Sequence, residues 1–148
     1  NKRSKNIITN SKTGRESKFL WKSEYSVNVQ VIDNQHRKIL FIINNINNAL
    51  FSKNYYNLKL NLKTLNEFAL YHFEFEENLL NKYGYDISDH KEKHTLIIEQ
   101  LDKIYQRVLN DENCEKSDIS EFLSQWITIH ILEEDKKYSS YLNSKNIF

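Results

Sequence analysis

The sequence predicts an all-α fold, an antiparallel four-helix bundle with up-down-up-down connections, an N-terminal arm and a short C-terminal extension. Three observations support this prediction. The 148 residues contain no proline and only two glycines, so the residues that most often interrupt helices are almost absent. Apolar residues recur in four segments at alternating spacings of four and three, and short polar connections separate the segments. The length suits a single domain.

The first two segments are joined by the polar connection FSKN, residues 51–54. Asp33 lies near the start of the first segment, where we expect it to cap the helix. The seam of the first segment, meaning the stripe that faces the other helices, consists of Ile32, His36, Ile39, Ile43, Ile46 and Leu50. The seam of the second segment consists of Leu58, Leu62, Leu65, Ala69, His72, Glu76, Leu79 and Tyr83.

The third and fourth segments follow the connections YGYDISD, residues 83–89, and NDENCEKSD, residues 110–118. Asp118 is expected to cap the fourth helix. The seam of the third segment consists of His90, His94, Ile97, Leu101, Ile104 and Val108. The seam of the fourth consists of Ile119, Leu123, Trp126 and His130. The short connections place consecutive helices antiparallel to each other.

The N-terminal residues 1–20 differ from the rest in charge. They carry six lysines or arginines and one glutamate, a net charge of +5, and the whole chain has +1, so the remainder carries −4. The basic residues are not interleaved with aromatic ones, which favours a flexible arm or linker over a nucleic-acid interface. We therefore expect a basic arm at 1–20, a bundle domain at 21–148 and no nucleic-acid partner.

The cellular setting is predicted from what the sequence lacks. No apolar run approaches the roughly 18 residues of a membrane span, and no signal-peptide segment is recognisable, so we expect a cytoplasmic protein without a membrane partner. Cys114 is the single cysteine and lies in a polar run, which favours an ordinary free thiol. The absence of methionine suggests a piece of a longer polypeptide, in which signalling domains could be covalently linked.

All five histidines of the chain lie at seam positions, where a bundle places its core. A single histidine there is more often a hydrogen-bonded core residue than a metal ligand. The depth of a residue is its position along the bundle axis, and it follows from the number of residues between it and the turns, which are centred near residues 54, 83 and 112. With about 1.5 Å of rise per residue, the five histidines and Glu76 lie at one depth to within about 3 Å. They are therefore predicted to form one site.

A metal would compensate these polar groups for the loss of water. His72 with Glu76, and His90 with His94, are pairs at positions i and i+4, which share one helix face and can ligate one metal together. Imidazole and carboxylate ligands suit iron, zinc, copper or nickel, so the ligand types alone leave the element open.

From about Trp21 to Tyr141 the sequence resembles the hemerythrins, non-haem di-iron proteins that bind dioxygen. The resemblance lies in the segments WKSEYSVNVQVIDNQH, HFEFE, HKEKH and HILEED. It implies a ligand set of His36, His72, Glu76, His90, His94, His130 and Asp135. By this resemblance the last three histidines hold one iron, the first two hold the other, and both carboxylates bridge the ions together with an oxo or hydroxo group. One position on the second iron is then left open for dioxygen.

The resemblance and simple helix geometry disagree about the last ligand. Glu134 lies four residues after His130 and would share its face on an ideal helix, whereas Asp135 is rotated by about 140°. We follow the resemblance and expect Asp135 to be presented from the flank of the fourth helix. Glu133 and Glu134 are then expected to form an ordinary charged face.

The resemblance also implies an apolar pocket around the open position, with Tyr138 nearby. The pocket residues are Ile39, Phe73, Trp126, Ile127 and Ile131. These residues are also expected to pack in the core, and a dry pocket would in addition slow the entry of water and protons. Reversible dioxygen binding for carriage, storage or delivery is the leading functional hypothesis, and no enzymatic activity is expected. The alternatives are an oxygen or redox sensing module of a larger signalling protein and, less favoured by a histidine-rich site, an iron-dependent oxidase or peroxidase.

Overall fold

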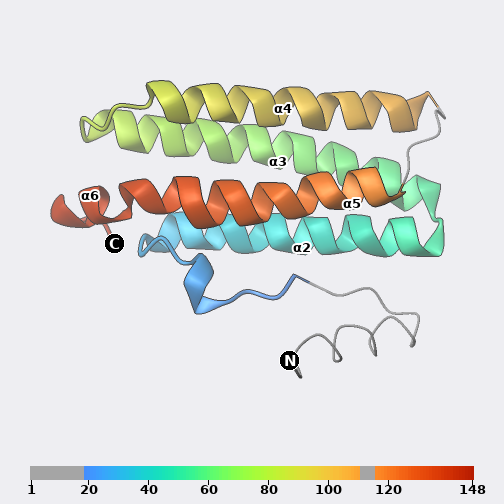
Figure 1. Ribbon diagram of the computed structural model, residues 1–148, viewed down its shortest axis with the longest axis horizontal. Helices are drawn as coiled ribbons and strands as arrows, with labels where there is room; N and C mark the ends of the chain where they lie inside the picture. Colours follow the sequence, from blue (N-terminus) through green and yellow to red (C-terminus); the bar gives the residue numbers. More distant parts are fainter. Residues whose placement is uncertain (1–18, 111–115) are drawn as a thin grey trace, which may run out of the picture.

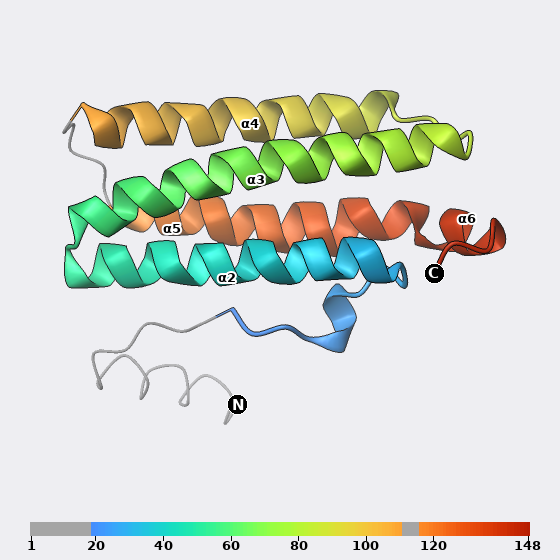
Figure 2. The same ribbon diagram turned by 180° about the vertical axis from the view of Figure 1, so that it is seen from behind.

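The computed structural model describes residues 19–110 and 116–148. Four long helical stretches lie side by side and alternate in direction along the chain (Figure 1), and Figure 2 shows the same arrangement from behind. They are α2 (Gln30–Ser52), α3 (Tyr55–Lys82), α4 (Ser88–Leu109) and a fourth stretch that begins with α5 (Lys116–Gln125). The described residues contain no β-strand. The predicted all-α four-helix bundle is therefore confirmed.

The fourth stretch changes its winding along its length. α5 is followed without a break by a π-helical segment, η2 (Trp126–Glu134), and a 3₁₀ segment, η3 (Asp135–Tyr138). A short helix, α6 (Ser139–Ser144), then forms the C-terminal extension. This irregular winding begins where the fourth stretch reaches the histidine layer.

The segment before α2 is tied to the bundle. It contains one 3₁₀ turn, η1 (Ser23–Tyr25), and runs beside α2 (Figure 1). Asn44 of α2 accepts the backbone N–H of Phe19 at 2.8 Å and donates its amide to the Phe19 carbonyl at 3.0 Å. Residues 1–18 lie outside the described part of the chain, so the arm and its boundary at residue 20 stay predictions.

The predicted caps of the first and fourth helices were wrong. α2 begins at Gln30, two residues before the first seam residue, and Asp33 lies within its first turn. The Asp33 carboxylate instead reaches back past the helix start, where it accepts the Val27 N–H at 2.9 Å and the Ser26 hydroxyl at 2.6 Å. Asp118 likewise lies in the first turn of α5 and not before it. Both helices start earlier than their apolar patterns do.

The core is divided into two apolar clusters by a layer of polar side chains. The larger cluster lies toward the α2–α3 turn and includes Ile39, Phe73 and Ile127. The smaller cluster lies at the other end and consists of Val27, Val29, Ile32, Leu80, Tyr138 and Leu142. On α2, His36 lies between the two clusters. Leu80 is fully buried and Leu79 only half-buried, so the seam of α3 shifts by one residue past the layer.

No helix in the described part of the chain is long and apolar enough to span a bilayer. Cys114 lies outside the described residues, so its assignment as a free thiol stays a prediction.

Replacing Asp33 by alanine should lower the free energy of unfolding by about 1–3 kcal/mol, because the buried Val27 N–H loses its acceptor. Asn34→Ala changes an exposed neighbouring side chain and should shift the same quantity by no more than about 0.5 kcal/mol. Urea unfolding of the two metal-free variants measures both effects. Equal stabilities would contradict an anchoring role for Asp33.

Candidate metal centre

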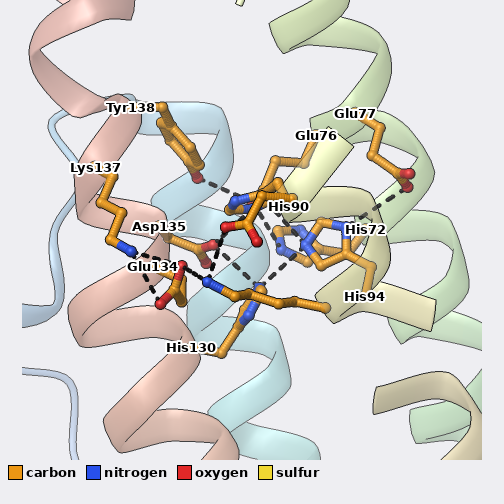
Figure 3. Close-up of polar contacts among 12 residues, drawn as sticks. His72, Glu76, Glu77, His90, His94, His130, Glu134, Asp135, Lys137 and Tyr138 are labelled. Carbon is orange, nitrogen blue, oxygen red and sulfur yellow. Dashed lines mark hydrogen bonds and ion pairs between the residues drawn. The ribbon is translucent and has the colours of Figure 1, made fainter. Parts of the chain in front are cut away.

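The structure brings all seven predicted ligands together from four helical stretches. α2 provides His36, α3 provides His72 and Glu76, α4 provides His90 and His94, and the fourth stretch provides the remaining two. Every one of the seven is buried, and none is more than 6% exposed. Figure 3 shows six of them pointing toward one another between the helices: His72, Glu76, His90, His94, His130 and Asp135.

Glu76 lies against histidines of three helices. Its Oε1 atom is 2.5 Å from His90 Nε2 and 3.2 Å from His94 Nε2, both on α4. Its Oε2 atom is 3.3 Å from His72 Nε2, one turn earlier on α3, and 4.0 Å from His36 Nε2. The two carboxylate oxygens therefore face different groups of imidazoles.

Asp135 occupies a corresponding position on the opposite side. Its Oδ1 atom is 3.0 Å from His90 Nε2 and 3.1 Å from His130 Nε2. Its Oδ2 atom is 3.1 Å from His36 Nε2. The seven side chains thus form two overlapping groups, one with three histidines and one with two, and both groups contain Glu76 and Asp135.

The π-helical winding of η2 explains why Asp135 and not Glu134 faces the histidines. The backbone N–H of Asp135 donates to the carbonyl of His130, five residues earlier, where an α-helix would bond four residues apart. Residues five apart then lie on adjacent turns of the same face. The fourth helix thus presents Asp135 through a change of winding, which the expectation of an approach from its flank did not include.

The expected charged face at Glu133 and Glu134 is also only partly present. Glu133 is exposed, but the Glu134 side chain is only 12% exposed. Glu134 accepts from Lys93 Nζ at 2.5 Å and from Lys137 Nζ at 3.0 Å. These bonds lower the pKa of the Glu134 carboxyl, with the bond from Lys93 the largest cause.

The two central carboxylates are held in their ionised form. Burial favours the neutral acid of Glu76, but hydrogen bonds with His72, His90 and His94 outweigh it, so the pKa of Glu76 is well below its usual range. Burial raises the pKa of Asp135, and the like charge of Glu76 raises it further. The surrounding histidines again outweigh them, and the pKa of Asp135 is lowered far below its usual value.

Burial lowers the pKa of the histidines His36, His72 and His90, whereas the charges of the neighbouring carboxylates raise it. Burial lowers the pKa of His90, but Asp135 and Glu76 outweigh it and raise that pKa to about 10. The pKa of His36 is also raised, because Asp135 outweighs burial. Burial prevails for His72, whose pKa is lowered. In the metal-free protein, protons on the histidines therefore balance part of the carboxylate charge.

Several buried polar atoms of the centre lack a well-formed hydrogen bond, which indicates that these residues fit a cation. His36 Nε2 and both carboxylate oxygens of Asp135 make no hydrogen bond of good geometry among the described residues, although histidine nitrogens lie 3.0–3.1 Å from each of these oxygens. His94 Nε2 and His130 Nε2 lie 3.0 Å apart, so two nitrogens are aimed at one place. Imidazoles and carboxylates converging in this way are typical of a site for iron, zinc, copper or nickel. The residues present therefore fit a buried metal.

Sequence reasoning missed one functional side chain. Gln35 Oε1 accepts the Nδ1–H of His72 at 2.6 Å, which leaves His72 Nε2 as the ring nitrogen that faces the centre. Gln35 is buried, although it is polar and lies one residue off the predicted seam. Gln35 lies next to His36 and three residues after the seam residue Ile32. This position could have indicated that its side chain forms a hydrogen bond with a residue of the centre on another helix.

Tyr138, which the resemblance placed near the site, contacts Glu76. Its hydroxyl donates to Glu76 Oε2 at 2.9 Å. Burial raises the pKa of Tyr138 well above its usual value, and the charges of Glu76 and Asp135 act in the same direction. The phenol therefore stays protonated and acts as a donor.

All five residues of the predicted apolar pocket are buried. Phe73 stacks on His94 with ring centroids 3.9 Å apart, and its ring lies 5.7 Å from that of His130 and 5.8 Å from that of Trp126. Ile39 and Ile127 belong to the larger apolar cluster next to the layer. The centre is thus bounded by apolar side chains on this side.

A family model described as the hemerythrin HHE cation binding domain matches residues 27–142, which contain all seven side chains of the centre. The chain belongs to the hemerythrin family. The resemblance seen in the sequence is therefore confirmed. Membership of this family agrees with the fit of the buried cluster to a metal.

Known members of the hemerythrin family match most of the chain. A bacteriohemerythrin of Pseudomonas aeruginosa is 32% identical over 121 residues, covering 81% of this chain and 78% of that protein. A bacteriohemerythrin of Clostridium acetobutylicum is 30% identical over 126 residues, covering 81% and 98% respectively. A crystal structure of wild-type hemerythrin superposes with a TM-score of 0.78 at 25% identity, covering 84% of this chain and 97% of that one.

Metal binding should release protons from the centre. His90, with its pKa raised to about 10, is protonated at pH 8 in the metal-free chain, and it must lose that proton to ligate a metal. Calorimetric titrations at pH 8 in buffers of different ionisation enthalpy should show at least one proton released per chain. Affinity should fall as the pH is lowered, because protons compete more strongly. A binding heat that does not depend on the buffer would contradict this protonation state.

Asp135→Ala should lose metal, because it removes a carboxylate shared by both groups of ligands. Glu134→Ala should keep the full metal content, because Glu134 contacts lysines and not the histidines. Elemental analysis after anaerobic loading with ferrous iron gives metal per chain for both variants. Loss in Glu134→Ala with retention in Asp135→Ala would reverse the assignment.

Proposed function

We propose that the chain binds dioxygen reversibly at a pair of iron ions, for carriage, storage or delivery of oxygen. The observation that carries the proposal is the division of seven buried side chains into two ligand groups that share both carboxylates. Such a division suits two metal ions placed next to each other. Membership of the hemerythrin family supports iron as the metal.

In this proposal the two ions have different ligands. His90, His94 and His130 would hold one ion, and His36 and His72 would hold the other. Glu76 and Asp135 would be shared by the two ions, with an oxo or hydroxo group as a further ligand. The ion held by two histidines would have one protein ligand fewer, so dioxygen would bind there. When bound, the iron pair supplies the reversible electron donation that dioxygen binding needs.

The protein's own side chains orient the ligands and exclude water. Gln35 fixes which nitrogen of His72 carries the proton, and Tyr138 holds Glu76 through a hydrogen bond. Phe73 and Trp126 cover the layer with aromatic surface, and both are almost fully buried. Excluding water in this way protects a ferrous centre from proton-dependent oxidation.

The ligand types favour binding over turnover. Five of the seven side chains are neutral imidazoles when they ligate a metal, and only two are carboxylates. Neutral ligands stabilise highly oxidised iron less than anionic ones do, so the centre is better suited to return dioxygen than to activate it. We therefore propose that the chain is not an enzyme.

The proposal is tested by loading the protein with ferrous iron without oxygen, admitting oxygen and then removing it under inert gas. Two irons per chain and a visible absorption band that appears with oxygen and disappears without it are expected. Glu76→Ala should lose both the metal and the band, whereas Glu74→Ala, which changes an exposed carboxylate on the same helix, should keep both. An iron-loaded protein with no spectral response to oxygen, or one that oxidises a substrate catalytically, would overturn the proposal.

A further inference from the structure

An ion pair joins two of the helical stretches that carry the centre. Lys93 on α4 and Glu134 at the end of η2 have Nζ and Oε2 atoms 2.5 Å apart. Lys93 directly precedes His94, and Glu134 directly precedes Asp135. Each charge is therefore one peptide unit away from a side chain of the centre. A contact at this position can hold the two stretches at a fixed separation beside the proposed metal.

Packing between these two stretches is interrupted next to the pair. A groove of about 270 Å³ lies between α4 and the fourth stretch, with His130 among the residues that line it. Lys93, Leu96, Ile129 and Glu134 also line it. Leu96 and Ile129 are more than half exposed, so apolar side chains do not close the groove from outside. The Lys93–Glu134 pair spans the groove next to the centre.

The pair belongs to a row of four alternating charges. Lys93 also lies 2.9 Å from Asp89 Oδ2, and Glu134 also lies 3.0 Å from Lys137 Nζ. Figure 3 shows Glu134 and Lys137 beside Asp135. The side chain of Glu134 is 12% exposed and that of Lys93 is 33% exposed, so water screens this pair less than a fully exposed one. A partly buried network holds its geometry better than an isolated surface pair.

We propose that the Lys93–Glu134 pair is a clasp that holds α4 against η2 and limits the rate at which metal leaves the centre. The inference rests on the metal site of the proposed function. Contacts at the layer, such as His94 with His130 at 3.0 Å and His90 with Asp135 at 3.0 Å, also join the two stretches. The ion that His90, His94 and His130 would hold takes ligands from both stretches, so its release would be easier when these stretches separate. The clasp opposes that separation, and Lys93 and Glu134 act as positioning residues.

Loss of the clasp should change the rate of metal release, whereas loss of a ligand should change how much metal is bound. Neither residue contacts the metal in this assignment, so variants at both positions should still take up two ions per chain. Lys93→Met leaves Glu134 paired with Lys137, and Glu134→Gln leaves Lys93 paired with Asp89. Lys93→Met takes a partner from the exposed Asp89, and Glu134→Gln takes a partner from the exposed Lys137, but water solvates both charges. The free energy of unfolding should therefore fall by no more than the contribution of one such pair, and local opening beside the centre should become easier by the same amount.

The experiment measures how fast iron passes from the loaded protein to an excess of a coloured chelator. Lys93→Met and Glu134→Gln should each release iron roughly fivefold faster than the starting protein. The double variant should release it no faster than either single variant, because the same contact is lost in all three. Lys93→Arg, which keeps the charge, should release iron at nearly the original rate. Glu133→Gln, which removes an exposed charge next to Glu134, is the matched control and should leave the rate unchanged.

Urea unfolding of the metal-free variants separates the clasp from a general loss of stability. Single variants that release iron at the original rate would overturn the clasp, and so would a double variant whose effect is the product of the two single effects. A Glu133→Gln variant as fast as Glu134→Gln would overturn it as well, and so would a fall in unfolding free energy much larger than the change in release rate corresponds to. Starting protein that takes up no metal would overturn the proposed function and the clasp together. If the starting protein holds zinc and not iron, and the variants release zinc with the rate differences expected for iron, the clasp stands and the iron assignment fails.

Discussion

The burial of two ionised carboxylates among five imidazoles is the constraint on which the rest of the structure depends. Moving a carboxylate out of water is strongly unfavourable unless charges or donors compensate it. Here each carboxylate lies within 3.3 Å of histidine nitrogens from at least two helical stretches. All four stretches must therefore place these side chains at the same depth. The bundle fold provides rigid helices of sufficient length, and the polar layer fixes how they are aligned.

The fourth helical stretch shows what this alignment requires locally. A regular α-helix through His130 would turn Glu134 toward the other histidines and leave Asp135 at an angle. The π-helical winding of Trp126–Glu134 reverses these positions. π-Helical turns are uncommon and occur frequently at functional sites, where a departure from the usual winding is offset by the contacts it permits. The same winding directs Glu134 outward, toward the lysines of α4 and η3.

Much of the fold and six of the seven residues of the centre could be predicted from spacing along helices, whereas Asp135 was assigned by the resemblance alone. Seam periodicity identified four helices, and equal depth grouped the histidines with Glu76. The winding of η2 could not be predicted from periodicity, since a local change of hydrogen bonding leaves no apolar pattern of its own. Gln35 and Asp33 were missed or misassigned for a related reason. Their partners, His72 and the Val27 backbone, lie on other segments that the helical pattern of α2 does not describe.

The division of the core by the polar layer has a consequence for local unfolding. The apolar cluster at the α2–α3 turn and the cluster around Val29, Leu80 and Leu142 share no buried residue, and the polar layer lies between them. Without metal, the helix backbones and the polar side chains of the layer connect the two ends of the bundle. Each end can then open as a separate cooperative unit with its own rate of amide hydrogen exchange. A metal bound to all four helical stretches would join these units into one.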